Sequence, residues 1–265
     1  MARTVLITGA SSGIGLATAA ALVARGYRVL GTSRYPDSVR QPVDGVEYLA
    51  LDLQDPSSIE ALAGPLKAVD ILVNNAGESQ SGPLEELPAA ALQRIFQVNV
   101  LGPVRLTQLA VPGMRERGYG RVVMVGSMLA SFPLAYRSSY VATKAALKGF
   151  SNAARHEFSP FGVWLTTVEP GSINTGISER RTSYIAARSP HARDYAAMLA
   201  ALNRNERAGV SAARVARTIV AAVEAAKPRQ RYAVGSNAPL VFALRRVVPT
   251  ALAEKLTHRR HGLSR

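Results

Sequence analysis

The chain has 265 residues, of which 48% are hydrophobic, and this size and composition predict a single α/β domain with one large core. It has no cysteine, no apolar run of the about 20 residues that span a bilayer and no signal-peptide layout, so we exclude disulfides and thiolate chemistry and expect a cytoplasmic protein. The formal net charge of +14 comes from scattered basic residues without a recognition-helix, zinc or RNA-binding signature, so we expect no nucleic-acid partner.

Short β-branched or apolar runs alternate with helical segments along the chain. The predicted strands are Thr4–Thr8, Tyr27–Thr32, Val46–Leu51, Asp70–Val73, Arg121–Val125, Val163–Val168 and Arg231–Gly235. The predicted helices are Leu16–Arg25, Pro56–Leu62, Ala89–Arg117, Ser138–Ser159, Ala192–Leu202 and Ser211–Ala226. We expect Pro103 and Pro112 to bend or break the helix that contains them. The pattern predicts a Rossmann-type doubly wound parallel sheet of about seven strands, with helices on both faces, in one domain spanning residues 1–265.

Two segments lie outside this regular alternation. Residues 176–207 follow a strand's carboxyl end and are polar, which predicts a lid over a substrate. Residues 236–265 form a basic C-terminal extension with apolar stretches. This extension could contact an anionic membrane surface weakly, pack at a subunit interface, or fold over the substrate cleft.

Glycines join the first predicted strand to the first helix in the run Thr8-Gly9-Ala-Ser11-Ser12-Gly13-Ile14-Gly15. Glycine permits a tight turn and lets backbone N–H groups approach a pyrophosphate, and the helix N-terminus adds positive potential. The spacing is G-x-x-x-G-x-G rather than the general G-x-G-x-x-G. A ligand-free tight turn is the alternative, but the position directly after the first strand favours a dinucleotide site.

The end of the second strand indicates which dinucleotide is bound. A site for NAD typically has Asp or Glu there, which accepts hydrogen bonds from the ribose 2′-OH. This chain instead has Ser33 and Arg34, with no acidic residue before Asp37. Arg34 could pair with a 2′-phosphate and Ser33 could hydrogen-bond it, so we expect NADP(H) rather than NAD(H). A surface arginine in a loop is the alternative, and Ser12 supplies no second positive charge.

Three residues carry the predicted chemistry. Tyr140 and Lys144 stand four apart in an alanine-rich run, so they project from one face of a helix. A nearby ammonium favours the phenolate and lowers the pKa of a tyrosine. Ser127 follows an apolar strand, so its hydroxyl is expected at the strand's carboxyl end, where open α/β sheets bind ligands. With the glycine-rich start, these residues predict an enzyme that moves a hydride and a proton.

The order and spacing of these motifs resemble those of the short-chain dehydrogenases/reductases over roughly residues 4–235. The matching pieces are Thr8-Gly9-x-x-x-Gly13-x-Gly15, Asp52-Leu53, Asn74-Asn75-Ala76-Gly77, Asn99, Ser127, Tyr140-x-x-x-Lys144 and Pro170-Gly171. The resemblance implies a Rossmann-type fold with cofactor and chemistry in one domain, and a homodimer or homotetramer. It also implies further cofactor contacts from Asp52, Leu53, Asn75, Ala76, Gly77, Pro170, Gly171, Ile173 and Thr175.

The resemblance further implies catalytic roles. Tyr140 would protonate the developing alkoxide, and Lys144 would hydrogen-bond the nicotinamide ribose and lower the pKa of Tyr140. Ser127 would hydrogen-bond the substrate carbonyl oxygen, where charge develops. Asn99 would hold a water in a proton relay behind Lys144, with a helix-bending polar residue as the alternative. No metal is expected, because the four histidines are dispersed and no acidic cluster has ligand spacing.

Within the family, the residues around Gly77, Ser127 and Pro170, together with Arg34, are similar to those of one branch. That branch contains 17β-hydroxysteroid dehydrogenases, retinol dehydrogenases and acyl-dihydroxyacetone-phosphate reductases, which implies a lipophilic or bulky carbonyl compound, steroid-like or retinoid-like. The residues expected to line the substrate pocket beside Ser127 are Leu129, Phe132, Leu134, Tyr136 and Ile177.

We therefore expect an NADP(H)-dependent oxidoreductase that interconverts a ketone or aldehyde and an alcohol. An NAD-linked alcohol dehydrogenase of the same family is one alternative. A non-catalytic, NADP(H)-binding redox sensor is the other, although such relatives usually lack the tyrosine or the lysine.

Overall fold

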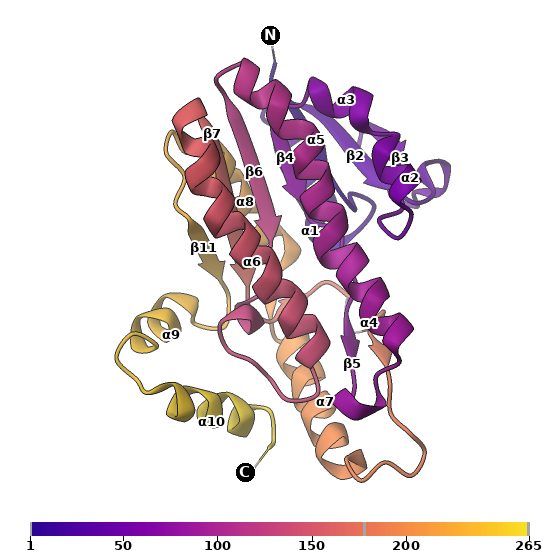
Figure 1. Cartoon of the computed structure of the whole chain (residues 1–265), viewed down its shortest axis with the longest axis vertical. Helices are drawn as coiled ribbons and strands as arrows, with labels where there is room; N and C mark the ends of the chain where they lie inside the picture. Colours follow the sequence, from indigo (N-terminus) through magenta and orange to yellow (C-terminus); the bar gives the residue numbers. More distant parts are fainter. Residues whose placement is uncertain (1, 177–178, 264–265) are drawn as a thin grey trace.

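The computed structural model describes residues 2–176 and 179–263, and within them seven parallel strands form the central sheet (Figure 1). The spatial order is β11-β7-β6-β4-β1-β2-β3, and each neighbouring pair runs parallel. The strands are β1 (Thr4–Ile7), β2 (Arg28–Ser33), β3 (Val46–Ala50), β4 (Ile71–Asn74), β6 (Gly120–Val125), β7 (Val163–Pro170) and β11 (Arg231–Val234). The predicted doubly wound parallel sheet is confirmed.

Helices cover both faces of this sheet because its strands alternate their side chains between two apolar cores. Leu6 joins the core beneath α5 and α6, while its neighbours Val5 and Ile7 join the core beneath α1 and α8. All three are fully buried, and burying each such side chain contributes about 1.5–3 kcal/mol. The helices are α1 (Gly13–Val23) and α8 (Ala212–Glu224) on one face, and α2 (Pro56–Glu60), α3 (Ala63–Lys67), α5 (Gly102–Glu116) and α6 (Ser138–Phe158) on the other.

The long predicted helix 89–117 is continuous over Ala89–Glu116 and changes its hydrogen-bonding pattern once. It consists of α4 (Ala89–Phe96), a π-helical turn over Gln97–Leu101, and α5. Pro103 lies in the first turn of α5, directly after the π-helical turn, and no break occurs there. Pro112 lies inside α5 without ending it.

Short elements follow the sheet's carboxyl ends. β5 (Gln80–Ser81) pairs with β9 (Thr182–Ser183), and β8 (Ile173–Asn174) pairs with β10 (Val210–Ser211). The predicted lid segment contains β9 and α7 (Ala192–Arg207), and α7 packs its buried side chains on the loop before α6. Its role as a lid stays a prediction.

The C-terminal extension forms two helices, α9 (Ala238–Leu244) and α10 (Thr250–Arg260), which lie beside the lower end of α6 in the view of Figure 1. The extension is attached to the body of the protein, since the backbone N–H of Ala135 donates to Nε2 of His258 at 3.2 Å and Leu263 packs into the α7 core. Leu244 and Val247 remain exposed on it. Membrane contact through this surface stays a prediction, and no helix in the described ranges is both long and apolar enough to cross a bilayer.

Candidate active site

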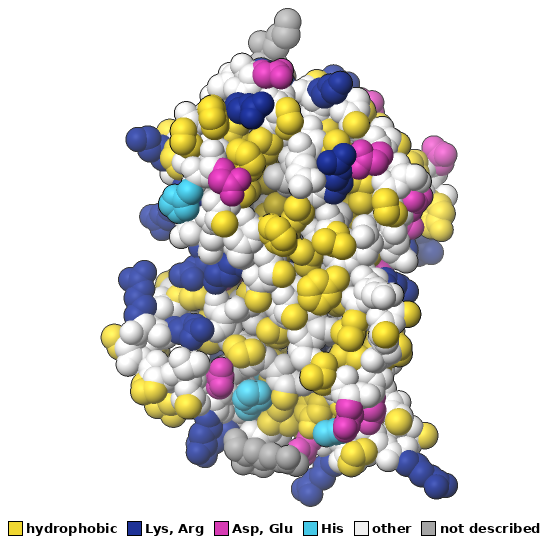
Figure 2. Space-filling model, viewed as in Figure 1, with side chains coloured by type: hydrophobic (Ala, Val, Ile, Leu, Met, Phe, Trp, Pro, Cys, Tyr) yellow, Lys and Arg dark blue, Asp and Glu magenta, His cyan; other side chains and the backbone are white. Residues whose placement is uncertain are grey.

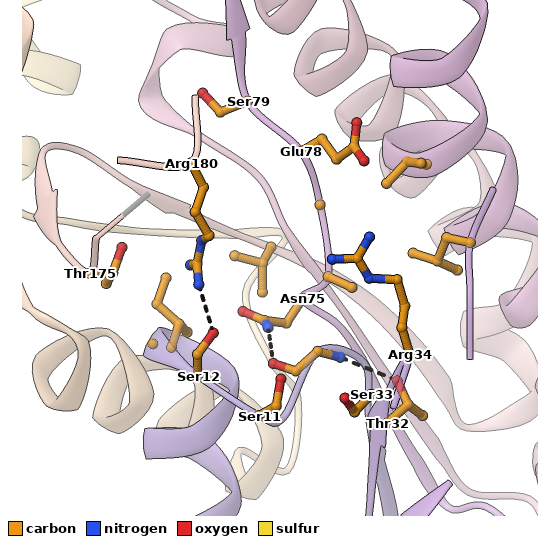
Figure 3. A pocket seen from close by; sticks show the side chains of 18 of the residues that line it. Ser11, Ser12, Thr32, Ser33, Arg34, Asn75, Glu78, Ser79, Thr175 and Arg180 are labelled. Atoms are coloured by element: carbon orange, nitrogen blue, oxygen red, sulfur yellow. Dashed lines mark hydrogen bonds between the residues drawn. The ribbon is translucent and has the colours of Figure 1, made fainter. Parts of the chain in front are cut away.

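The sheet's strand order reverses at β1, which pairs with β2 on one side and β4 on the other. The loops that follow β1 and β4 therefore diverge and open a crevice at the carboxyl ends of the strands. Thr8 joins these loops, because its Oγ1 accepts hydrogen bonds from the backbone N–H groups of Asn75 and Ala76, both at 2.9 Å. In return, Nδ2 of Asn75 donates to the carbonyl oxygen of Thr8 at 2.9 Å and to that of Gly9 at 3.3 Å (Figure 3). The glycine loop is thus fixed against the loop after β4.

The glycine loop leaves the N-terminus of α1 available to an anion. Gly9 and Gly13 adopt φ angles of 68° and 56°, which favour glycine. A Cβ on Gly15 would lie 2.1 Å from the carbonyl oxygen of Gly9, so Gly15 serves close packing of helix and loop. Ser12 caps α1 without a side-chain cap bond, and no acidic residue occupies the first turn. The positive end of the helix dipole therefore faces the crevice without an internal counter-charge.

A positively charged side chain lies beside the glycine loop, and the sequence did not predict it there. Nη1 of Arg180, from the segment between β8 and β9, donates to Oγ of Ser12 at 3.2 Å (Figure 3). The two residues are 168 positions apart, and Arg180 belongs to no motif, so no local pattern could have paired them. The charge that Ser12 itself does not supply comes from Arg180.

Arg34 follows β2 directly and points into the same crevice (Figure 3). Its exposed side chain makes no hydrogen bond or ion pair with another described residue, so its guanidinium is available to a ligand. Oγ of the neighbouring Ser33 accepts a hydrogen bond from the backbone N–H of Tyr35 at 3.2 Å. No carboxylate takes the place that an NAD-type site gives to Asp or Glu.

One cavity of about 700 Å³ connects the glycine loop, Arg34, Tyr140 and Lys144. This volume lies within the about 300–1,000 Å³ that small-molecule and cofactor sites occupy. Gly15 and Gly171, both predicted cofactor contacts, do not line it. The predicted cofactor residues that line it are Gly9, Ser11, Ser12, Gly13, Ile14, Ser33, Arg34, Asp52, Leu53, Asn75, Ala76, Gly77, Tyr140, Lys144, Pro170, Ile173 and Thr175. The donor set, with a free helix N-terminus and two arginines, fits a phosphorylated dinucleotide.

Tyr140, Lys144 and Ser127 lie where this cavity adjoins a smaller one: Tyr140 lines both, Lys144 lines the larger and Ser127 lines the smaller. Tyr140 and Lys144 lie one turn apart on α6 and are buried. Nζ of Lys144 donates to the carbonyl oxygen of Val125 at 2.9 Å and lies 5.8 Å from the centroid of the Tyr140 ring. Ser127 follows β6, and its Oγ accepts from the backbone N–H of Leu129 at 3.2 Å. The three polar groups can therefore contact one substrate oxygen and one cofactor.

Burial is the main cause of the pKa shifts of Tyr140 and Lys144. It raises the pKa of the Tyr140 phenol, against the charge of Arg137 and then the Ser127 hydroxyl, which lower it. Burial also lowers the pKa of Lys144 to about 8. The net shift of the Tyr140 pKa is upward, and the lowering effect predicted for Lys144 stays a prediction. The guanidinium of Arg137, 4.4 Å from the ring centroid, lowers this pKa, and that of Arg181 lowers it less.

Asn99 lies in the π-helical turn and is almost fully buried. Its Oδ1 accepts from the backbone N–H of Glu78 at 2.8 Å, and its Nδ2 donates to the Glu78 carbonyl at 3.0 Å and to Oγ1 of Thr143 at 3.3 Å. A Cβ on Gly77 would stand 3.0 Å from Oδ1 of Asn99 and 3.7 Å from Nζ of Lys144. Asn99 thus holds the loop after β4 against α6, and its predicted water relay stays a prediction.

A second cavity, of about 160 Å³, adjoins Ser127 and Tyr140. Leu129 and Phe132 line it as predicted, and Gly171 lines this cavity rather than the larger one. Charged and polar residues that sequence reasoning missed also form its wall, namely Arg137, Glu206, Arg260 and His261. They come from the start of α6, from α7 and from the C-terminal extension, whose packing no local pattern predicts.

Two residues predicted for the pocket lie elsewhere, and a third cannot be placed. Leu134 is buried in a core with Tyr195 and Met198 of α7. Tyr136 packs its ring edge-on against Tyr195, with the centroids 5.9 Å apart. The prediction fails for both because α7 covers this side of the loop. Ile177 lies outside the described residues.

Within the described ranges, no group of three or more His, Asp or Glu side chains could hold a metal ion.

Comparison with known proteins agrees with this geometry. The family model described as short chain dehydrogenase matches residues 3–185. An uncharacterized oxidoreductase of Bacillus subtilis (strain 168) is 37% identical over 186 residues, which cover 65% of each chain. Human 17-beta-hydroxysteroid dehydrogenase type 1 is 38% identical over 196 residues, covering 68% of this chain and 60% of that protein. The chain thus spans less than two thirds of the length of either relative.

Solved structures share the fold over nearly the whole chain. A short-chain dehydrogenase from Streptomyces avermitilis has a TM-score of 0.79 and 34% identity, covering 98% of this chain and 97% of that one. Several other structures with the same fold, all under 25% identical, are complexes with NADP or NADPH. Because the family model spans well over half of the chain, the protein belongs to the short-chain dehydrogenase family.

Proposed function

We propose that the protein is an NADP(H)-dependent oxidoreductase that interconverts a ketone or aldehyde and an alcohol. The observation that carries this proposal is that Ser127, Tyr140 and Lys144 lie where a cavity of dinucleotide size adjoins a smaller cavity. Tyr140 lines both cavities, Lys144 lines the larger and Ser127 lines the smaller, as a reaction between a cofactor in one and a substrate in the other requires.

Different residues of the chain would hold different parts of the cofactor. The glycine loop, the N-terminus of α1 and Arg180 suit the pyrophosphate, because they place N–H donors and positive charge together. Arg34 suits a 2′-phosphate, which is why NADP(H) is favoured over NAD(H). When bound, this cofactor supplies or accepts the hydride at the substrate carbon.

Proton transfer falls to the tyrosine. The phenol of Tyr140 is protonated near neutral pH because burial raises its pKa, so in reduction it can donate its proton to the developing alkoxide oxygen. The hydroxyl of Ser127 hydrogen-bonds the same oxygen and stabilises the charge that forms there. Lys144, with a pKa of about 8, is mostly charged at pH 7 and favours the phenolate that remains.

The substrate cavity supports a small carbonyl compound. Its volume of about 160 Å³ is below the about 300 Å³ at which sites for drug-sized ligands begin. A steroid-like or retinoid-like substrate therefore requires the C-terminal extension, which contributes Val241 and His261 to the wall, to move. The expectation of a bulky lipophilic substrate stays a prediction.

The test is Tyr140→Phe, assayed against a panel of ketones, aldehydes and alcohols with NADPH or NADP⁺. We expect turnover to be lost, because the proton donor is gone, while NADPH binding measured by fluorescence is unchanged. Tyr184→Phe, which removes a hydroxyl outside both cavities, is the control and should keep full activity. Retained turnover in Tyr140→Phe would contradict the mechanism. Tight NADPH binding with no turnover of any compound by the unmodified protein would instead favour the redox sensor.

A further inference from the structure

Arg137 is a buried cation that makes no ion pair with a carboxylate in the described part of the chain. It lies at the N-terminal cap of α6 and is 3% exposed. Its Nε and Nη1 are buried and make no hydrogen bond to any described residue. A buried guanidinium without an ion pair is costly, because the contact with the Tyr140 ring replaces only part of the hydration that the charge loses. The fold retains it nevertheless, three residues before the catalytic tyrosine.

The charges that face Arg137 do not neutralise it. Glu206 of α7 is the one carboxylate among the groups that influence it, and Arg181 is a second cation nearby. Both Oε atoms of Glu206 already accept hydrogen bonds from Nη2 of Arg181, each at 2.6 Å. Arg260 and His261, from the C-terminal extension, border the same cavity. Two buried guanidinium groups therefore share one carboxylate, and the wall of the cavity keeps an excess of positive charge.

Arg137 is also placed beside the reacting groups. It lines the small cavity together with Ser127 and Tyr140, and its Cζ lies 4.4 Å from the centroid of the Tyr140 ring. A substrate oxygen that accepts the proton of Tyr140 would thus lie close to the guanidinium. The fork of N–H donors on an arginine matches a carboxylate in shape and charge.

We propose that Arg137 binds a carboxylate of the substrate, so that the substrate is a short oxo acid or hydroxy acid with its carboxylate within a few bonds of the reacting carbon. This inference rests on the proposed oxidoreductase function and names the class of its substrate. The small cavity leaves room for a short chain, and the apolar side chains of Met128, Leu129 and Phe132 can contact its methylene groups. The carboxylate supplies the counter-charge that no described residue gives to Arg137.

The test compares acids with their own methyl esters. 2-Oxobutanoate, 3-oxobutanoate and 4-oxopentanoate are each assayed with NADPH against the corresponding ester, using the full chain, Arg137→Met, Arg137→Lys and Arg193→Met. Arg193 is exposed on α7 and lines neither cavity, so its variant removes the same charge away from the site. We expect the unmodified protein and Arg193→Met to prefer at least one acid about tenfold or more in kcat/KM, as a charged hydrogen-bonded pair gives.

In Arg137→Met this preference should disappear, with the ester changed less than about threefold, and Arg137→Lys should keep part of it. Absence of a preference for any acid would overturn the proposal. So would an equal loss for acid and ester in Arg137→Met with a shifted pH profile, because Arg137 would then act on Tyr140 alone. Calorimetric titration of 3-hydroxybutanoate into the NADP⁺-loaded protein separates the two proposals. Binding that Arg137→Met abolishes supports the carboxylate site even if no compound is turned over, and equal binding by both proteins contradicts it.

Discussion

Arg34 and Arg180 both carry positive charge into the cofactor cavity, and we propose that they bind different phosphates of the cofactor. Arg34 extends from the end of β2, where the 2′-position of an adenine ribose distinguishes NADP from NAD. Arg180 donates to Ser12 at the cap of α1, where the pyrophosphate common to both cofactors is held. We therefore expect Arg34→Ala to change cofactor preference and Arg180→Ala to change affinity without changing preference.

The magnitude follows from the contacts that each variant removes. A hydrogen bond to a charged group contributes about 1.5–3 kcal/mol, and the exposure of Arg34 places its contribution at the lower end of this range. Because its side chain has no partner among the described residues, Arg34→Ala breaks no internal bond. The expected result is about tenfold weaker NADPH binding with NADH changed less than about threefold. Arg34→Asp should go further and favour NADH, since an acid can accept bonds from the free 2′-OH.

Dissociation constants for NADPH and NADH, measured by quenching of the protein's fluorescence, give the ratio directly. Arg180→Ala is the matched control, and it should weaken both cofactors by the same factor. An unchanged ratio in Arg34→Ala, or a changed ratio in Arg180→Ala, would refute the assignment of the two arginines.

Three further results are expected. The pKa of Lys144 is about 8 in the folded protein and 10.5 in the unfolded chain, so between these pH values the unfolded state binds more protons. The free energy of unfolding, measured with urea, should therefore rise across this pH range by about 3 kcal/mol in the unmodified protein relative to Lys144→Met. Asn99→Ala leaves the backbone groups of Glu78 without their partner and should lower the free energy of unfolding by about 1–3 kcal/mol, and an unchanged urea midpoint would contradict this. Figure 2 shows apolar side chains along the face formed by α5 and α6; in this part of the chain Phe150 and Phe161 are 48% and 49% exposed. We propose that two copies of the chain associate through this face. Sedimentation velocity should then show Phe150→Glu as a smaller species than the unmodified protein.

The sheet could be predicted because its signals are local. Each core strand is a short run of β-branched or leucine side chains, and the alternation of Val5, Leu6 and Ile7 between two buried faces requires helices on both sides. The glycine loop and the Tyr140–Lys144 pair were predictable for the same reason, since a turn or a helix face is determined within a few residues.

The substrate side was predicted less well because its residues meet only through tertiary packing. Leu134 and Tyr136 are close in sequence to Ser127, yet α7 covers them and turns them into core. Arg137 is surrounded by charges from distant segments, Arg181 and Glu206, and Arg180 donates to a serine 168 positions away. Neither spacing nor hydrophobic periodicity contains that information.

The family model ends at residue 185, and part of the wall of the small cavity lies beyond that point. The residues of the wall that follow it are Leu202, Glu206, Val241 and His261. Ser127, Tyr140 and Lys144 come before it, so exchange of the last third of the chain would change the wall of the substrate cavity and leave these three residues in place. Replacing residues 186–263 with the corresponding segment of a relative should therefore change substrate specificity. A tag fused at the C-terminus would extend the same segment that lines the substrate cavity.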